Sequence, residues 1–222
     1  MGAETWGLSM KTETSADPRP RQKRSVAATR RMLEAGRALL NERDIDQISV
    51  QDIVTAAETS VGSFYHNFGT KDALFQTLVR EMAINREAIA MANFGDTPIE
   101  RLPAVLVRGA IDNHRRYQGL LRAAIRQHLS GSPVWEPITA MGQNIAEEYD
   151  RRLEAHLGRA LKSREKERIA FAFVWLYGIL AQSVLGLNTL SDYRIPDEIF
   201  EEETTNMFSS MLMRAVETAD RE

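Results

Sequence analysis

The sequence predicts an all-α protein with a small helical head followed by a larger helical bundle. Apolar residues recur at three- and four-residue steps in nearly every segment, which is the period of an amphipathic helix. Residues that favour helix N-caps precede several of these segments. No internal repeat or convincing strand pattern is present. We therefore expect three parts: a disordered arm over residues 1–24, a head over 25–94, and a bundle over 95–222.

Composition excludes several classes of site. The chain has 222 residues, 43% hydrophobic and 27% charged, as in ordinary soluble proteins. It contains no cysteine, so disulfides, thiolate metal sites and cysteine nucleophiles are excluded. The first 25 residues contain no apolar stretch typical of a signal peptide. A cytoplasmic location is the expectation.

Charge is distributed unevenly. Residues 19–37 contain seven Arg or Lys and a single acid, Glu34, whereas residues 81–222 contain 17 basic and 21 acidic residues. A basic end joined to a mildly acidic body is typical of a nucleic-acid-binding head attached to something else. A solvated tail and helix face would give the same pattern, so the charge alone does not decide between the two.

The head begins with a predicted helix over 25–43. Ser25 is its expected N-cap, and Asp44 is expected just beyond its C-terminus, where Gly is easier to accommodate. Ser49 and Asp52 then resemble a capping box. The next helix has an inward face at helical spacing, formed by Val50, Ile53, Val54 and Ala57.

A tight turn follows this second helix at Glu58-Thr59. Ser60 is the expected N-cap of a third helix, which Gly69 ends before Thr70 caps a fourth. Three apolar residues of the third helix are expected to face inward or nearly so: Val61, Phe64 and Phe68. The opposite face stays open, and helix-turn-helix motifs present such a face to the DNA major groove. We place the helix-turn-helix at about residues 48–67.

The composition changes near residue 95, and the rest of the chain also reads as helices. The expected helices cover 99–117, 119–129, 133–161, 163–187 and 196–218. Residues 169–190 contain no charged residue, and their length would suit a membrane span. Gln182, Ser183 and Asn188 interrupt the run, so we expect a helix buried on all sides in a bundle, and no membrane partner.

Residues 64–75 read Phe-Tyr-His-Asn-Phe-Gly-Thr-Lys-Asp-Ala-Leu-Phe. Together with the three preceding helices, this segment resembles the tetracycline-repressor (TetR) family of bacterial regulators. The resemblance covers about Thr29 to Val79; beyond residue 95 only the helical pattern and length are similar. Two positions depart from the family pattern. Glu58 and Asp44 stand where the family usually has Gly.

The resemblance implies a transcriptional regulator with two parts, a DNA-binding domain and a bundle for effector binding and dimerisation. Two copies would place their recognition helices in successive major grooves of a near-palindromic operator. A small, largely apolar effector, bound among the C-terminal helices, would then release the operator. The expected location is cytoplasmic, in association with the nucleoid.

The predicted DNA contacts lie at the helix-turn-helix and the basic arm. Val61, Gly62 and Ser63 would face bases; none of them offers the bidentate contacts of Arg, Lys, Asn or Gln. Phosphate contacts are expected from Ser49, Tyr65, His66 and Lys71, and Ser60 is expected to contact DNA from the same open face. The arm would add Arg21, Lys23 and Arg24, in the minor groove.

The bundle contains candidate effector and dimer residues. Aromatic, His and Met side chains could line an apolar pocket with polar tips: His114, Tyr117, Trp135, Met141, Tyr149, Phe171 and Trp175. Residues of this kind at helical spacing also form ordinary cores. The last two helices carry more apolar surface than one domain needs, so we expect a homodimer through a four-helix interface.

Other functional classes are less well supported by the sequence. No Glu-x-x-His pair, His-Glu-x-x-His motif or cysteine cluster is present, so we expect no metal, no cofactor and no catalysis. A DNA-binding regulator without an effector remains an alternative, as does an activator. These two alternatives have the same DNA-binding head as the predicted repressor and differ from it in the function of the bundle.

Overall fold

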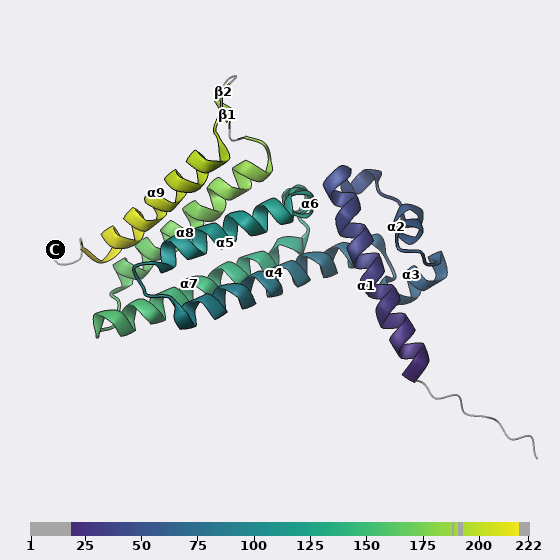
Figure 1. Cartoon of the computed structure of the whole chain (residues 1–222), viewed down its shortest axis with the longest axis horizontal. Helices are drawn as coiled ribbons and strands as arrows, with labels where there is room; N and C mark the ends of the chain where they lie inside the picture. Colours follow the sequence, from purple (N-terminus) through teal and green to yellow (C-terminus); the bar gives the residue numbers. More distant parts are fainter. Residues whose placement is uncertain (1–18, 188, 191–192, 218–222) are drawn as a thin grey trace, which may run out of the picture.

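The computed structural model describes residues 19–187, 189–190 and 193–217 of the chain (Figure 1). It confirms the all-α prediction. The described helices are α1 (Arg19–Glu42), α2 (Val50–Ala56), α3 (Val61–Phe68), α4 (Lys71–Asp96), α5 (Leu102–Arg116), α6 (Gln118–Leu129), α7 (Glu136–Leu157), α8 (Ser163–Val184) and α9 (Asp197–Glu217). The described part of the chain also contains two 3-10 turns, η1 (Ile45–Gln47) and η2 (Pro133–Trp135), and an antiparallel pair of short strands, β1 (Thr189–Leu190) and β2 (Tyr193–Arg194).

Helices α1, α2 and α3 form the head together with the start of α4. Their apolar faces meet in one core, and Met32, Ile53, Phe64 and Phe75 are among its fully buried side chains. Local capping sets where the helices begin. Ser60 Oγ accepts from the Ser63 N–H at 3.2 Å, and Thr70 Oγ1 accepts from the Ala73 N–H at 3.0 Å. Gly69 ends α3 at a φ of 72°. The predicted caps of α3 and α4 are thus confirmed.

Helix α1 begins earlier than predicted. It starts at Arg19, so Ser25 lies inside the helix and does not cap it. Pro20 is tolerated there because a proline in the first helical turn loses no intrahelical hydrogen bond. The expected disordered arm therefore does not include residues 19–24, whose backbone is helical; its residues 1–18 lie outside the described part of the chain.

Asp44 also differs from its predicted role. Its backbone is extended, with φ −67° and ψ 150°, and it begins η1. Helices often end with a residue in the left-handed conformation, and Asp44 was expected at that position because no glycine follows the helix. The chain turns instead through the 3-10 segment, and Gln47 Oε1 accepts a hydrogen bond from the Asp44 N–H at 3.3 Å.

Helix α4 runs from the head into the bundle, where it lies along α7 (Figure 1). It ends at Asp96, close to the predicted boundary, but it contacts both the head helices and the bundle helices and its buried residues belong to one continuous core, so the division at residue 95 stays a prediction. Helix α6 packs against α1, and Arg126 bridges to Asp44 at 3.1 Å and to Asp46 at 3.1 Å. These contacts join the bundle to the head.

Helices α8 and α9 pack on each other and α9 also covers α5. The prediction that α8 is buried on all sides is wrong for the single chain. Phe171 is 62% exposed and Val174 is 69% exposed, on the same outward face. The β1–β2 hairpin was missed because strands of two residues leave no alternating pattern. Among the described residues, no helix is both long and apolar enough to cross a membrane.

Candidate nucleic-acid interface

Helices α2 and α3 are joined by a tight turn whose backbone is tied to α2. Ala57 N–H donates to Ile53 O at 2.9 Å and Thr59 N–H donates to Val54 O at 2.9 Å. Glu58 occupies the left-handed region with φ 49°, the one positive φ of a non-glycine residue in the described chain. This is the position where the sequence departs from the usual turn glycine, and the departure leaves the left-handed turn in place.

Helix α3 buries one side and exposes the other. Phe64 is fully buried, and its ring centroid lies 5.6 Å from that of Phe68. Of the predicted contacts, Ser63 is half-buried and the others on the helix and its cap are exposed: Ser60, Val61, Gly62, Tyr65 and His66. Val61, Gly62, Tyr65 and His66 thus share one exposed face of the helix, with Ser60 at its start and Ser63 at its margin.

Side chains from α1 hold α3 and the turn in place from behind. Asn67 Oδ1 accepts hydrogen bonds from Thr29 Oγ1 at 2.9 Å and Ser25 Oγ at 3.1 Å. Arg31 Nε donates to the carbonyl of Ala57 at 2.9 Å. The sequence gives no local signal for these bonds, because the partners are 26 to 42 residues apart. They fix the angle at which α3 is presented.

Gly62 is open to solvent, and nothing in the fold demands glycine there. An added Cβ would find only Ser60 Oγ, at 3.9 Å. Glycine in a helix costs roughly 1 kcal/mol relative to alanine. A glycine without an internal reason on this edge is compatible with a partner that approaches the backbone closely.

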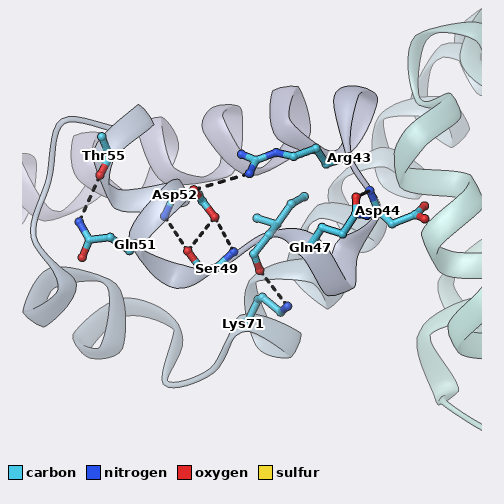
Figure 2. A network of polar contacts seen from close by, with 9 residues as sticks. Arg43, Asp44, Gln47, Ser49, Gln51, Asp52, Thr55 and Lys71 are labelled. Atoms are coloured by element: carbon cyan, nitrogen blue, oxygen red, sulfur yellow. Dashed lines mark hydrogen bonds and ion pairs between the residues drawn. The ribbon is translucent and has the colours of Figure 1, made fainter.

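Ser49 caps α2 as predicted (Figure 2). Its Oγ accepts from the Asp52 N–H at 3.1 Å and donates to Asp52 Oδ2 at 2.7 Å. Hydrogen bonds from Ser49, and then the charge of Arg43 at 3.6 Å, hold the pKa of Asp52 below its usual value. The Ser49 hydroxyl is exposed but already engaged in this network.

Lys71 lies at the first turn of α4 and reaches back to the segment before α2 (Figure 2). Its Nζ donates to Ile45 O at 2.8 Å and to Ile48 O at 2.9 Å. The ammonium therefore braces the head. A lysine has three N–H donors, so one remains for a phosphate oxygen.

The exposed side of α2 carries two polar residues that the sequence reasoning missed. Gln51 Nε2 donates to Thr55 Oγ1 at 3.2 Å (Figure 2), and both side chains are exposed, whereas Ile53 and Val54 are buried. The i, i+4 spacing of polar residues on an otherwise apolar helix is the signal that could have found them.

The basic residues predicted to contact DNA from an extended arm lie on a helix instead. Arg21, Lys23 and Arg24 lie on the first turns of α1, so they extend from a helix, not from an extended arm. Their side chains lie outside the described part of the structure. A role in the minor groove stays a prediction.

The structure separates several of the seven predicted effector residues. Tyr117 lies between α5 and α6, 5.9 Å below the guanidinium of Arg37 in α1. Trp135 packs beside His128, with ring centroids 5.9 Å apart. Tyr149 is buried against Phe173 in the bundle core. These three residues serve different contacts.

The other four effector residues also occupy different surroundings. Phe171 faces outward on α8, Met141 is buried on α7, and Trp175 is half-buried. His114 lines a cavity of about 340 Å³ between α5, α8 and the start of α9. Burial lowers the pKa of His114 to about 4, so its imidazole is neutral. Of the seven, His114 alone lines this cavity.

No group of three or more His, Cys, Asp or Glu residues is placed to hold a metal ion among the residues that the structure describes. The site therefore consists of a helix edge with hydroxyl, aromatic and imidazole groups. Such an edge can bind by hydrogen bonds and close packing.

Comparison with known proteins identifies this arrangement. Residues 32–78 match the family model of bacterial regulatory proteins of the tetR family. The chain is 26% identical over 172 residues to the HTH-type transcriptional repressor AcnR of Corynebacterium efficiens, covering 74% of this chain and 86% of that protein.

Solved structures agree in fold. A protein of Mesorhizobium loti assigned to the TetR-family transcriptional regulators superposes with a TM-score of 0.67 at 17% identity, covering 86% of this chain and 98% of its own. A tetR-family regulatory protein of Rhodococcus RHA1 gives 0.63 at 15% identity, covering 83% and 96%. The tetR-family match thus covers the helix-turn-helix described above, and the chain as a whole shares the fold of solved TetR-family regulators.

Proposed function

We propose that this chain is a transcriptional repressor that binds a near-palindromic operator as a homodimer and is released by a small effector. The observation that carries the proposal is the exposed edge of α3, braced from behind by Asn67 and Arg31. Its similarity to AcnR, which is named as a transcriptional repressor, supports repression over activation.

The α3 edge would read DNA mainly by shape and apolar contact. Val61 would pack on a thymine methyl group, and Gly62 would let the backbone approach the bases. Tyr65 and His66, with the hydroxyls of Ser49 and Ser60, would contact phosphates. The third donor of Lys71 would add a charged contact. Since no bidentate base contact is available at positions 61–63, deformability of the operator would contribute to specificity.

The homodimer would form through α8 and α9. Phe171 and Val174 are exposed on α8, and Met207 and Met213 are exposed on α9. Gly178 continues the stripe of Phe171 and Val174, and a Cβ there would meet nothing within 4 Å. An apolar stripe with a glycine lets two helices approach closely, and a second copy would cover it. This leaves the two heads free to reach two half-sites.

Effector binding would occur within the bundle. The cavity lined by His114 measures about 340 Å³, within the range of small-molecule sites. It adjoins α5, α8 and the start of α9, so a bound molecule would act on helices that contact both α6 and the proposed dimer face. The movement would change the separation of the two heads.

Binding to DNA is tested by gel retardation of genomic fragments with the full chain at low ionic strength. We expect retardation of a subset of fragments, and footprints with two related half-sites. Half-sites about one helical turn apart or a multiple of it would support a symmetric dimer. If no fragment is retarded, the proposed function is wrong. Binding by a protein that no small molecule releases would indicate a regulator without an effector.

A further inference from the structure

Arg86 is a buried arginine in the centre of the bundle. It lies on α4, and only 5% of the residue is exposed. Its Nη2 donates to the carbonyl of Leu106 at 3.1 Å. Its Nη1 is buried and has no hydrogen-bond partner among the residues that the structure describes. A guanidinium carries five N–H donors and stays charged, so this side chain has unused binding capacity.

The charge of Arg86 is not neutralised by the described residues. None of their carboxylate oxygens lies within 4.0 Å of the guanidinium, although Asp112, exposed on α5, acts on it at longer range. Tyr177 also lies nearby, but burial raises the pKa of its phenol to about 12, so it remains neutral. A buried charge without a close partner is destabilising, and a counter-charge from a bound molecule would remove that cost.

Two glycines make room around these polar groups. An added Cβ at Gly109 of α5 would lie 3.4 Å from Cζ of Arg86, and one at Gly142 of α7 would lie 3.0 Å from Cε2 of Tyr177. Both positions are inside helices, where alanine would be favoured. The space that they leave belongs to a polar cluster built by four helices.

His114 connects this cluster to the cavity. Its Nδ1 hydrogen-bonds to the Ala110 carbonyl at 2.8 Å, which makes Nδ1 the donor and Nε2 an acceptor. It lines the 340 Å³ cavity, and the Arg86 charge acts on it. Arg86 does not itself line the cavity, so a ligand there would contact His114 and would reach Arg86 only with an end that extends past His114 toward α4.

We propose that Arg86 recognises an oxyanion group of the effector, a carboxylate or a phosphate, with the Tyr177 hydroxyl as a neighbouring donor. This inference rests on the proposed function, because it assumes that the bundle binds an effector. The planar fork of Arg86 suits bidentate binding of either group. The effector is therefore amphipathic: an apolar body with an anionic end. This replaces the expectation of a largely apolar effector.

Anion binding would act directly on the helix that leads to the head. Helix α4 carries Arg86 in its second half and Lys71 at its start, where Lys71 holds the segment before α2. A counter-charge at Arg86 would remove the cost of the buried cation and favour the arrangement of α4 and α5 that encloses it.

Thermal unfolding of the full chain, without DNA, tests the inference. The probes are octanoate, phenylacetate and phenyl phosphate, with octanamide, phenylacetamide and phenol as neutral counterparts. The variants are Arg86→Met, Tyr177→Phe and, as a control, Arg108→Met, whose side chain is 74% exposed on α5. We expect at least one anion to raise the Tm of the wild type, with its neutral counterpart ineffective. Its Kd should rise roughly tenfold to a hundredfold in Arg86→Met, less in Tyr177→Phe, and not in Arg108→Met.

The ligand-free stability of Arg86→Met gives a second readout. An unpaired buried cation replaced by an apolar side chain should leave the Tm unchanged or raise it. A Tm well below that of Arg108→Met would overturn the inference by showing that Arg86 is structural. So would a wild type that responds to none of the anions, or one that responds equally to neutral counterparts. Retained DNA retardation in these cases would leave the proposed regulator intact, which separates the two failures.

Discussion

Gly119 lies against the backbone of Leu40 with no room for a side chain between them. A Cβ at Gly119 would lie 1.9 Å from the Leu40 carbonyl oxygen and 2.4 Å from its carbonyl carbon. Gly119 is on α6 and Leu40 is near the end of α1, so this contact joins the bundle to the head. Only glycine allows the two helices to approach so closely.

Replacement of Gly119 by alanine should push α6 away from α1. Because the neighbouring atoms are backbone, they cannot rotate aside, and overpacking of this kind costs about 1–3 kcal/mol or more. We expect a lower Tm and weaker DNA binding. Gly95→Ala is the control, since an added Cβ there meets nothing within 4 Å. Equal stability of the two variants would show that the contact does not constrain the head.

Glu58→Gly should stabilise the head. The left-handed backbone at φ 49° costs a non-glycine residue roughly 1 kcal/mol, which glycine avoids, although its greater freedom in the unfolded chain offsets part of the gain. Glu58→Ala keeps the backbone cost and removes the same charge. Urea unfolding should therefore show a gain for glycine alone. A gain in DNA affinity shared by the glycine and alanine variants would be due to the lost negative charge. Equal free energies of unfolding for the two variants would contradict the backbone argument.

Lys71→Met should affect both stability and salt dependence. Loss of the bonds to Ile45 and Ile48 carbonyls should lower the unfolding free energy by about 1–3 kcal/mol. Loss of a phosphate contact should also reduce the slope of log affinity against log salt by about one per subunit. Arg80→Met, on the exposed side of the same helix, controls for net charge. An unchanged slope would reject the phosphate contact, and unchanged stability would reject the brace.

Phe171→Glu should separate the proposed dimer. The side chain is 62% exposed in the single chain, so the substitution should leave the monomer fold intact. Light scattering should show half the wild-type mass, and operator affinity should fall because two linked half-site contacts become independent. Ile89→Glu, at a residue 57% exposed on α4, is the control and should remain dimeric. A dimeric Phe171→Glu would place the interface elsewhere.

Much of the head could be predicted because its signals are local. The caps at Ser49, Ser60 and Thr70 each depend on residues three positions away, and the inward face of α2 follows from its spacing. The start of α1 could not be predicted from the sequence, because Arg19 to Arg24 can extend a helix and Ser25 can equally serve as its N-cap. Its side chain instead bonds to Asn67, which is 42 residues away.

The bundle was predictable as helices but not as a site. Arg86 looks like an ordinary charged residue of an amphipathic helix, and its burial depends on Gly109 and Tyr177 from two other helices. Phe171 is exposed on α8 and does not line the cavity at His114, and the helical spacing of aromatic residues does not show which way each one faces. The burial of Arg86 and the exposure of Phe171 both depend on packing between helices far apart in the sequence, which no local sequence pattern predicts.

The most direct test of the α3 edge is oxidative footprinting of the full chain, free and bound to a retarded genomic fragment. Tyr65 is 53% exposed on α3 and Tyr193 is 67% exposed in the distant hairpin, so both should react in the free protein (Figure 1). We expect DNA to protect Tyr65 and His66 while Tyr193 reacts as before. Unchanged reactivity of Tyr65 and His66 in a chain that binds DNA would contradict the account.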